Sequence, residues 1–204
     1  MTMSTAHSIL PRFEHIKRHW DLMRKMNVAT IFPGELYVTK SHELITTLLG
    51  SCIAVCMRDR FNHIGGMNHF KLPKPDNKVA AVQNANYGIY AMELLINEIL
   101  KNGGKRQHLE CSVFGGGSVA DSLRNDIGGK NTEFVKQFLK EERISVIHQD
   151  VGHKSAQQVY FHPLSGNINS VVKDGKTLDE LKKTEHAYLE KINSEMEASS
   201  IIYF

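Results

Sequence analysis

The sequence predicts a mixed α/β fold of the α+β kind, in which mixed β-sheets are flanked by helices. Seven short segments have the β-branched or alternating pattern of strands, whereas only two segments between them repeat their apolar residues with the period of a helix. The 204 residues are 41% hydrophobic and 23% charged, a composition that can bury the core of one domain with helical additions at its ends.

The predicted strands all lie within residues 36–172, between the two ends of the chain. Their residues are β-branched, or alternate between apolar and polar as half-buried strands do. In chain order, the strands span residues 44–49, 53–57, 63–71, 108–114, 144–150, 158–162 and 167–172.

Two internal helices are predicted among these strands. Residues 87–100 are apolar on a helical period and are followed by Gly103 and Gly104, a common signal for the end of a helix. Residues 132–142 form the second helix, with Asn131 as its N-terminal cap. The face of this helix that points inward is predicted to consist of Phe134, Val135, Phe138 and Leu139.

Helical additions are predicted at both ends of the main domain, which spans residues 31–175. Residues 1–30 contain a helical pattern over 11–27, in which Ile16, Trp20 and Met23 recur at helical spacing. Residues 176–204 contain a second one, over 178–198. The first addition is basic and the second acidic, so that the two either pack together or each contact a partner.

The charge and hydropathy patterns exclude several classes of partner. The formal net charge is only +3, and no basic run or alternation of basic and aromatic residues is present, so we do not expect nucleic acid as a partner. No stretch approaches the roughly 20 apolar residues that span a bilayer, and the first residues lack a hydrophobic signal core. We therefore expect a cytoplasmic protein that does not insert into a membrane.

The cysteines and histidines do not form a recognisable disulfide or metal pattern. Three cysteines are an odd number, and Cys52 and Cys56 are a C-x3-C pair without a matching second pair, which argues against disulfides and structural zinc. The spacing of the later histidines matches no common metal site. We therefore expect no metal or cofactor, and free thiols.

A β-hairpin would bring one cysteine and one histidine together. Residues 59–62 (Asp-Arg-Phe-Asn) are turn-like and lie between two apolar runs. With the turn at the centre of this tetrad, Cys52 faces His69 on one side of the sheet, with β-carbons about 4.5–5.5 Å apart. A slip of one residue or a bulge would break this pairing.

Such a pair would suit nucleophilic catalysis, because the thiolate is the attacking species and a neighbouring imidazole can take the proton of the thiol. Gly50 and Ser51 before Cys52 would let the backbone turn sharply and point amide N–H groups at a developing oxyanion. The alternative is a structural thiol, since free cysteine is among the most buried residue types. Composition and spacing leave both interpretations open.

A glycine-rich stretch, Phe-Gly-Gly-Gly-Ser at residues 114–118, follows one of the predicted strands. It matches neither the dinucleotide-binding fingerprint nor a Walker motif, because no Lys-Ser/Thr follows at the required offset. Gly115 and Gly116 are therefore predicted to permit a close approach of the backbone to a substrate or to a neighbouring strand.

Six short motifs follow one another along the chain: L-G-S-C-I-A-V-C at 49–56, I-G-G-M-N-H-F-x-L-P at 64–73, Y-G-x-x-A-M-E-x-L-I at 87–96, F-G-G-G at 114–117, I-G-x-x-N at 127–131 and D-V-G at 150–152. Their order, without large gaps over residues 34–173, resembles that of the CheD family of chemoreceptor glutamine deamidases. The first two motifs are the most specific.

The resemblance implies a catalytic pair, Cys52 and His69, assisted by Thr46 six residues before the cysteine, with Thr47 beside it as a rival for that role. It also implies a four-layer α/β/β/α arrangement with two mixed sheets. Contacts to the substrate or to the oxyanion would come from a wider set of small and amide residues: Gly50, Ser51, Asn68, Gly115 and Gly116.

The implied activity is hydrolysis of glutamine side chains to glutamate, with release of ammonia, in the cytoplasmic helical region of methyl-accepting chemotaxis receptors. Hydrolysis of receptor methyl esters is chemically the same acyl transfer, with methanol as the leaving group. One alternative is a non-catalytic regulatory adaptor that binds receptors or a CheC-type phosphatase. Another is a cysteine peptidase, which would cleave a chain instead of releasing ammonia.

Overall fold

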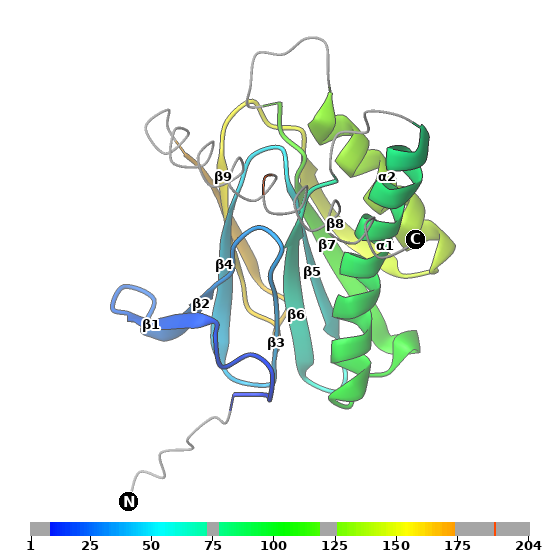
Figure 1. Ribbon diagram of the computed structural model, residues 1–204. Coiled ribbons are helices and arrows are strands. Elements are labelled where there is room, and N and C mark those ends of the chain that lie inside the picture. Colours follow the sequence, from blue (N-terminus) through cyan, green and yellow to red (C-terminus); the bar gives the residue numbers. More distant parts are fainter. Residues whose placement is uncertain (1–8, 73–77, 119–125, 174–189, 191–204) are drawn as a thin grey trace, which may run out of the picture.

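The structure is a computed structural model that describes residues 9–72, 78–118, 126–173 and 190 (Figure 1). The first sheet contains, in spatial order, β1 (Lys17–Asp21), β2 (Met26–Thr30), β4 (Glu43–Leu49), β9 (Gln157–Phe161) and β10 (Ile168–Val172). The second sheet contains β3 (Leu36–Thr39), β6 (Ile64–Phe70), β5 (Ile53–Asp59), β7 (Leu109–Gly115) and β8 (Ser145–Val151). The helices are α1 (Lys78–Lys101), α2 (Ile127–Glu141) and a short 3₁₀ helix, Arg106–His108.

The two sheets pack face to face, and α1 and α2 cover the outer face of the second sheet (Figure 1). Both sheets are mixed, because β2 pairs in parallel with β4, and β7 pairs in parallel with β8. The α+β fold is therefore confirmed. The described residues form three layers, and the fourth, helical layer stays a prediction. The helix predicted within 176–204 lies outside the described part of the chain, apart from Glu190, which is helical.

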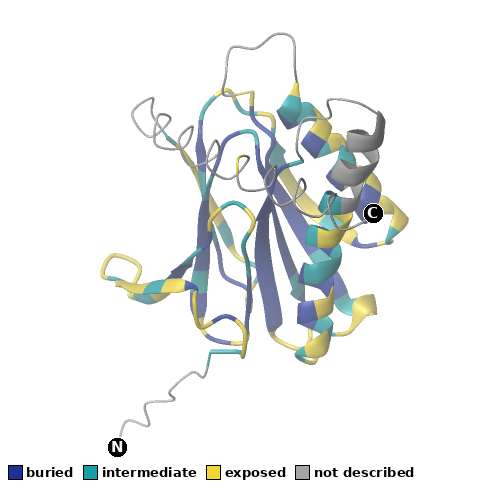
Figure 2. Ribbon diagram, in the orientation of Figure 1, coloured by how far each residue is buried: buried dark blue, intermediate teal, exposed yellow. Residues whose placement is uncertain are grey.

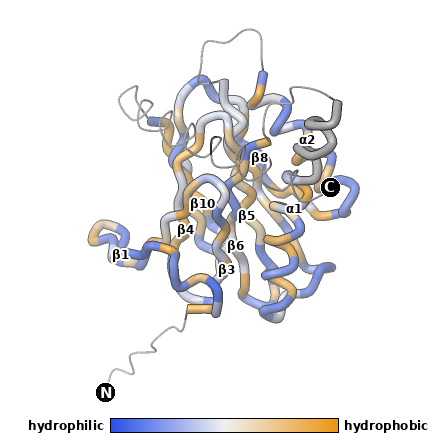
Figure 3. The backbone as a smooth tube through the Cα atoms, in the orientation of Figure 1, coloured by the Kyte–Doolittle hydropathy of each residue, from blue (hydrophilic) through white to orange (hydrophobic). Residues whose placement is uncertain are grey.

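The second sheet provides the centre of the core. Every residue of β6 is buried, as are all those of β5 except Arg58, because this pair has the first sheet on one face and α1 on the other (Figure 2). The connecting loops are mostly hydrophilic, while the hydrophobic segments run along the central strands (Figure 3). Burial on both faces explains why these strands do not alternate between apolar and polar residues.

The seven strands predicted from the sequence are all present, with ends within two residues of the predicted ones. The second internal helix begins earlier than predicted. Asp126 caps α2 by accepting a hydrogen bond from the Gly129 backbone N–H at 2.8 Å, and Asn131 is a fully buried residue of the second turn. The prediction that Asn131 is the cap was therefore wrong, because an Asp that bonds the N–H three residues on begins the helix sooner.

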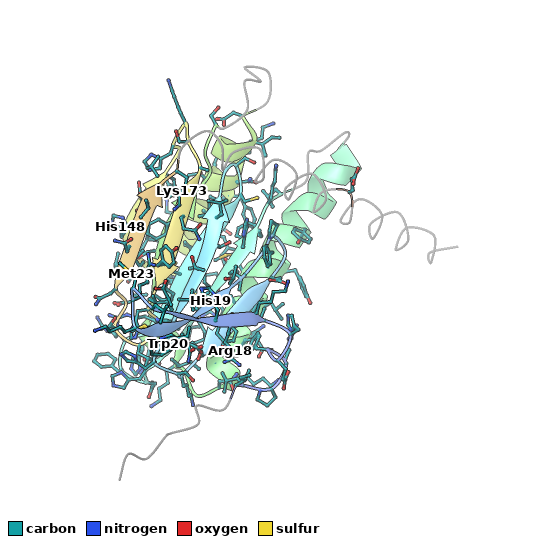
Figure 4. The ribbon with its side chains drawn as sticks, turned by 90° about the vertical axis from the view of Figure 1, so that its left-hand side faces the viewer. Arg18, His19, Trp20, Met23, His148 and Lys173 are labelled. Carbon is teal, nitrogen blue, oxygen red and sulfur yellow. The ribbon has the colours of Figure 1, made fainter. Side chains whose placement is uncertain are left out.

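The helix predicted over residues 11–27 is also wrong, because these residues contain β1 and the start of β2, which form an antiparallel hairpin. The apolar residues at helical spacing do not share a buried face: Ile16 is buried, whereas Trp20 and Met23 are 56% and 91% exposed (Figure 4). Hydrogen bonds from Arg24 to the Asp21 carboxylate close the turn, and β2 joins the first sheet beside β4. The hairpin is thus part of the sheet.

The hairpin of β5 and β6 is present, but its register differs from the predicted one by two residues. His69 pairs with Ala54 instead of with Cys52, because four residues, 60–63, form the loop between Asp59 and Ile64. The Asp59 carboxylate holds this loop by accepting hydrogen bonds from the backbone N–H groups of Phe61 and Asn62. A shift of two residues keeps side chains on the same face of the sheet, since strands alternate with a period of two.

The hydrogen bonds that the Asp59 carboxylate accepts are expected to stabilise the folded protein. Burial raises its pKa, but hydrogen bonds from the Asn62 side chain and from the N–H groups of Asn62, Lys105 and Phe61 outweigh burial, and the pKa lies below its ordinary value. Asp59→Ala is expected to lower the free energy of unfolding by roughly 2–4 kcal/mol at neutral pH, because it leaves these donors without an acceptor.

The pH dependence follows from the depressed pKa, and urea unfolding between pH 2 and 7 measures it. Stabilisation by Asp59 is complete above its unfolded-state pKa of about 4 and is lost as pH falls through the lower folded-state pKa, so the two proteins should converge in acid. Asp21→Ala, at the end of β1, is the control and should change stability less, because the carboxylate of Asp21 bonds to Arg24, which is itself partly exposed. Equal stability of Asp59→Ala and wild type at neutral pH would contradict the assignment.

Candidate active site

Residues 50–52 form a bend that carries the chain from the end of β4 in the first sheet to the start of β5 in the second, at the upper end of the molecule in Figure 1. All three carbonyl oxygens of the bend accept hydrogen bonds. Gly50 O accepts from Gly117 N at 2.7 Å, and Cys52 O accepts from Gly116 N at 2.7 Å. Ser51 O accepts from the side-chain amide of Asn131 at 2.8 Å. The bend is therefore held at every residue.

The glycines after β7 allow this close contact. Gly115 has a φ of 98°, and a β-carbon built on it would lie 2.1 Å from the carbonyl oxygen of Cys52. Gly116 has a φ of 60°, and a β-carbon there would lie 2.1 Å from the hydroxyl of Thr132. Both backbone angles and both distances exclude a side chain. The predicted close approach of these glycines to neighbouring backbone is thus present, and its target is the cysteine bend.

His69 lies on β6, 1% exposed, with its backbone N–H and C=O bonded to Glu35 O and Gly34 N. Its ring Nδ1 lies 2.7 Å from the hydroxyl of Thr47, which itself donates to the backbone carbonyl of Ile31 at 2.7 Å. A carbonyl can only accept, so the single hydroxyl proton of Thr47 is committed to Ile31. Nδ1 therefore carries a proton and donates it to Thr47, and in the neutral ring the lone pair lies on Nε2.

Cys52 lies in the bend directly before β5. On that strand, Ala54 pairs with His69, and Cys52 precedes Ala54 by two residues. Cys52 is fully buried. The structure thus places Cys52 two residues before the strand partner of His69, whose Nδ1 contacts Thr47.

Thr46 does not reach this site, contrary to the expectation from the resemblance. Its hydroxyl donates to Val159 O and accepts from the Gln158 side chain, both at 2.7 Å, on the outer face of β4. Thr47, its rival, contacts His69. An even offset between Thr46 and Cys52 would give a shared face only in one continuous strand, and the bend interrupts the strand and changes the sheet.

Asn68 is also placed elsewhere. Its side-chain amide donates to Ala91 O at 3.1 Å, on α1, and its oxygen accepts from Val55 N. Successive side chains of a strand point to opposite faces of the sheet. Asn68, directly before His69, therefore points to the face that α1 covers. Gly50 and Ser51 are part of the bend itself. Gly115 packs against the Cys52 carbonyl, and Gly116 donates a hydrogen bond to it.

Two of the site's residues were missed from the sequence. Asn131 bridges the bend to the strand after His69, and the Ile31 carbonyl orients Thr47. A backbone carbonyl leaves no signal in a sequence. The asparagine was visible within a motif, but only the approach of α2 shows what it touches.

The other two cysteines lie in the core and are poor nucleophiles. Burial raises the pKa of Cys56 well above its ordinary value, and burial and then Glu110 raise the pKa of Cys111 to about 12. Both thiols therefore stay protonated at neutral pH. Within the described ranges, no group of three or more His, Cys, Asp or Glu side chains could hold a metal ion.

Residues 115–117, three glycines at the end of β7 and directly after it, are called the glycine loop below. A groove of about 810 Å³ lies beside this loop, between the exposed side of α2 and the end of β8. Close to this groove, the Asp150 carboxylate contacts the ring Nε2 of His153 and the side-chain Nε2 of Gln157, both at 2.5 Å. Burial raises the pKa of Asp150, but hydrogen bonds, first from His153 and then from Ser170, hold it below its ordinary value. Asp150 is thus a carboxylate that fastens β8 to β9.

The fold and this site define a two-sheet α+β protein that holds a buried cysteine and an oriented histidine at one end of its strands. A family model described as "CheD chemotactic sensory transduction" matches residues 71–171. The "Probable chemoreceptor glutamine deamidase CheD 1" of Dechloromonas aromatica (strain RCB) is 44% identical over 158 residues, which cover 76% of this chain and 79% of the relative. The chain belongs to the CheD family.

A second relative matches almost the whole chain. The "Probable chemoreceptor glutamine deamidase CheD" of Thiobacillus denitrificans (strain ATCC 25259 / T1) is 41% identical over 193 residues, 91% of this chain and 94% of the relative. Among solved structures, the Bacillus licheniformis hypothetical protein YfiH is similar over 59% of this chain and 51% of its own, with a TM-score of 0.41 and 13% identity, too distant to support an inference. No helix in the described segments is long and apolar enough to cross a membrane.

The support that Gly115 gives to the bend can be measured against a matched glycine. Gly152 has a similar φ, 84°, but a β-carbon there would meet nothing within 4 Å. Gly152→Ala should cost only the strain of the backbone angle, about 1–3 kcal/mol. Gly115→Ala adds a backbone collision and should cost more than about 4 kcal/mol, if the chain folds at all. Urea unfolding compares them, and equal losses would mean that the bend tolerates displacement.

The tautomer of His69 is a second prediction. Ring ¹⁵N chemical shifts should identify the Nδ1–H form in the wild type, because Thr47 can only accept from this nitrogen. Thr47→Val removes the acceptor and should move His69 toward the Nε2–H form. Thr46→Val, an equally buried change whose hydroxyl bonds to β9, should leave the spectrum of His69 unchanged. An Nε2–H form in the wild type would overturn the orientation derived above.

Proposed function

We propose that the chain is a cysteine-dependent hydrolase that deamidates glutamine side chains of chemoreceptors, with Cys52 as nucleophile and His69 as its base. The observation that carries the proposal is the Thr47 contact, which puts the lone pair of His69 on Nε2, on a residue that pairs with Ala54, two residues after Cys52. The printed names of the relatives, chemoreceptor glutamine deamidases, supply the substrate.

The first half of the reaction forms a thioester. His69 Nε2 takes the proton of the Cys52 thiol, and the thiolate attacks the carbon of the carboxamide, whose double-bond electrons move to oxygen. The tetrahedral oxyanion then collapses. The bond from carbon to nitrogen breaks, and the imidazolium of His69 gives its proton to the departing nitrogen, which leaves as ammonia.

The second half consumes one water molecule. His69 Nε2 takes a proton from the water, and the oxygen attacks the thioester carbon. Collapse of this second intermediate breaks the bond from carbon to sulfur and releases glutamate and the Cys52 thiolate, which recovers the proton from the imidazolium. Each cycle thus converts one glutamine and one water into glutamate and ammonia.

The oxyanion would be held by backbone N–H groups near Cys52. Gly116 N is not available for this, because its single N–H already donates to Cys52 O at 2.7 Å. The Asn68 amide is bonded to α1. With the carbonyls of the bend all fixed, its amide groups need no reorganisation as charge develops on the substrate, which is the condition for strong electrostatic stabilisation.

Burial sets a condition on substrate binding. Cys52 and His69 are 0% and 1% exposed, so a glutamine side chain reaches them only when this end of the sheets opens. In the closed state, burial keeps bulk water away from Cys52 and His69 until the amide enters. The requirement for a partner surface that induces the opening fits a protein substrate better than a free amide.

The substrate region would be the cytoplasmic helical part of the receptors, and the protein would act in the cytoplasm. Each turnover adds one negative charge to a receptor helix and creates a carboxylate that a methyltransferase can esterify. Receptor methyl esters present the same acyl carbon with methanol as leaving group, so their hydrolysis belongs to the same proposal. A CheC-type phosphatase is the further partner that the family resemblance suggests.

Intact-mass analysis of a receptor cytoplasmic fragment incubated with the protein tests the proposal. Deamidation should add about one mass unit per modified site, because OH replaces NH2. Cys52→Ala should lower the rate by several orders of magnitude. Cys56→Ala, on β5 and buried in the core, is the matched control and should retain activity. If Cys52→Ala turns over at a wild-type rate, the nucleophile is wrong; if no protein modifies the fragment, the non-catalytic adaptor is the better interpretation.

A further inference from the structure

Asn131 on α2 connects the two pieces of chain that carry the proposed nucleophile and base. Its side-chain Nδ2 donates to Ser51 O at 2.8 Å, directly before Cys52. Its Oδ1 accepts from the backbone N–H of Leu72 at 3.0 Å, three residues after His69. Asn131 is 0% exposed, so water does not substitute for either partner. One planar amide therefore joins the cysteine bend to the end of β6.

The approach of α2 to the bend is unusually close, and it fixes where the amide of Asn131 can lie. A β-carbon on Gly128, in the first turn of α2, would lie 2.3 Å from Gly116 O and 2.6 Å from Gly117 O. The same two glycines donate their N–H groups to the carbonyls of Cys52 and Gly50. The first turn of α2 thus packs against the glycine loop, and Asn131 in the second turn bonds to Ser51.

We propose that Asn131 is a positioning residue that sets the placement of the Cys52 thiol relative to the His69 imidazole. The inference deepens the proposed function and rests on it. The Ser51 carbonyl belongs to the peptide unit whose nitrogen is that of Cys52, so the bond from Asn131 fixes the plane from which the cysteine side chain projects. The bond to Leu72 fixes the end of the strand that carries the histidine.

The chemistry of the side chain supports a two-sided role. An amide offers a donor and an acceptor in one plane, and the two partners require one of each. An ionised aspartate would keep the acceptor for Leu72 N–H but would turn an oxygen toward Ser51 O, while a protonated aspartic acid could again donate. A displacement of about 1 Å between reacting groups can lower a catalytic rate by about 10²-fold.

The test uses Asn131→Leu and Asn131→Asp in the full chain with the receptor fragment as substrate. Asn131→Leu should lower kcat about 10- to 100-fold and change KM by less than about threefold, because it misplaces the reacting groups without touching the docked surface. The ratio of Asn131→Asp to wild-type kcat should rise as pH falls, because burial favours the protonated acid and that form restores the bond to Ser51. The ratio for Asn131→Leu should not change with pH.

A second readout does not need the receptor. Mass spectrometry of tryptic peptides after iodoacetamide treatment gives the rate at which Cys52 is alkylated as a function of pH. Asn131→Leu should move the half-maximal rate to higher pH, because a displaced imidazole stabilises the thiolate less. Tyr37→Phe is the control for a purely structural loss. It removes a buried hydrogen bond from β3 to Glu43 on β4, at 2.7 Å, that involves neither the bend nor Asn131, and it should leave the alkylation profile and kcat unchanged.

The outcomes separate this inference from the proposed function. Activity in Cys52→Ala would reject the proposed nucleophile, whatever Asn131 does. Inactive Cys52→Ala together with wild-type kcat and alkylation in Asn131→Leu would reject the positioning role alone. A loss in the Asn131 variants that tracks only their urea midpoints, with a pH-independent ratio for Asn131→Asp, would likewise overturn it.

Discussion

The carbonyl groups of three consecutive residues, 50–52, hold the most constrained part of this molecule in place. They accept hydrogen bonds of 2.7–2.8 Å from the glycine loop after β7 and from α2. With each peptide plane fixed by a partner, the backbone sets the direction of the Cα–Cβ bond of Cys52. All three donors belong to elements on the side of the second sheet, so the bend is attached to that sheet even though β4 enters it from the first.

The Thr47 hydroxyl makes the complementary connection, because it reaches from the first sheet to His69 in the second. A hydroxyl group orients the ring but brings no negative charge, unlike the aspartate of a serine hydrolase triad. A neutral orienting group suits a thiol, which ionises near neutral pH far more readily than an alcohol and needs less help from an imidazolium partner. The face-to-face contact of the two sheets therefore matters for the imidazole as well as for the core.

Seven of the ten strands in the described part of the chain could be predicted, because burial and β-branching leave a local pattern. The family motifs pointed to Cys52 and His69, whose catalytic roles stay a proposal. The register of β5 with β6 could not be predicted, because it depends on the loop that Asp59 holds by accepting hydrogen bonds from the N–H groups of Phe61 and Asn62. The resemblance pointed to Thr46, but the contact of Thr47 with His69 could not be predicted, because the chain changes sheets between the two threonines and the cysteine. The N-terminal hairpin was predicted as a helix because Ile16, Trp20 and Met23 recur at helical spacing, although Trp20 and Met23 are exposed.

The connectivity of the first sheet has a consequence for the order of assembly. Thr46 on β4 bonds to Val159 on β9, 113 residues later in the chain, so during synthesis β4 has its β2 neighbour long before its other edge can be covered. Contacts of such long sequence separation form slowly, because the loop between them must close first. The strand that carries Thr47 thus completes its sheet among the last events of folding. A nascent chain that ends before β9 has an open β4 edge, a site for pairing with other chains that a chaperone would need to cover.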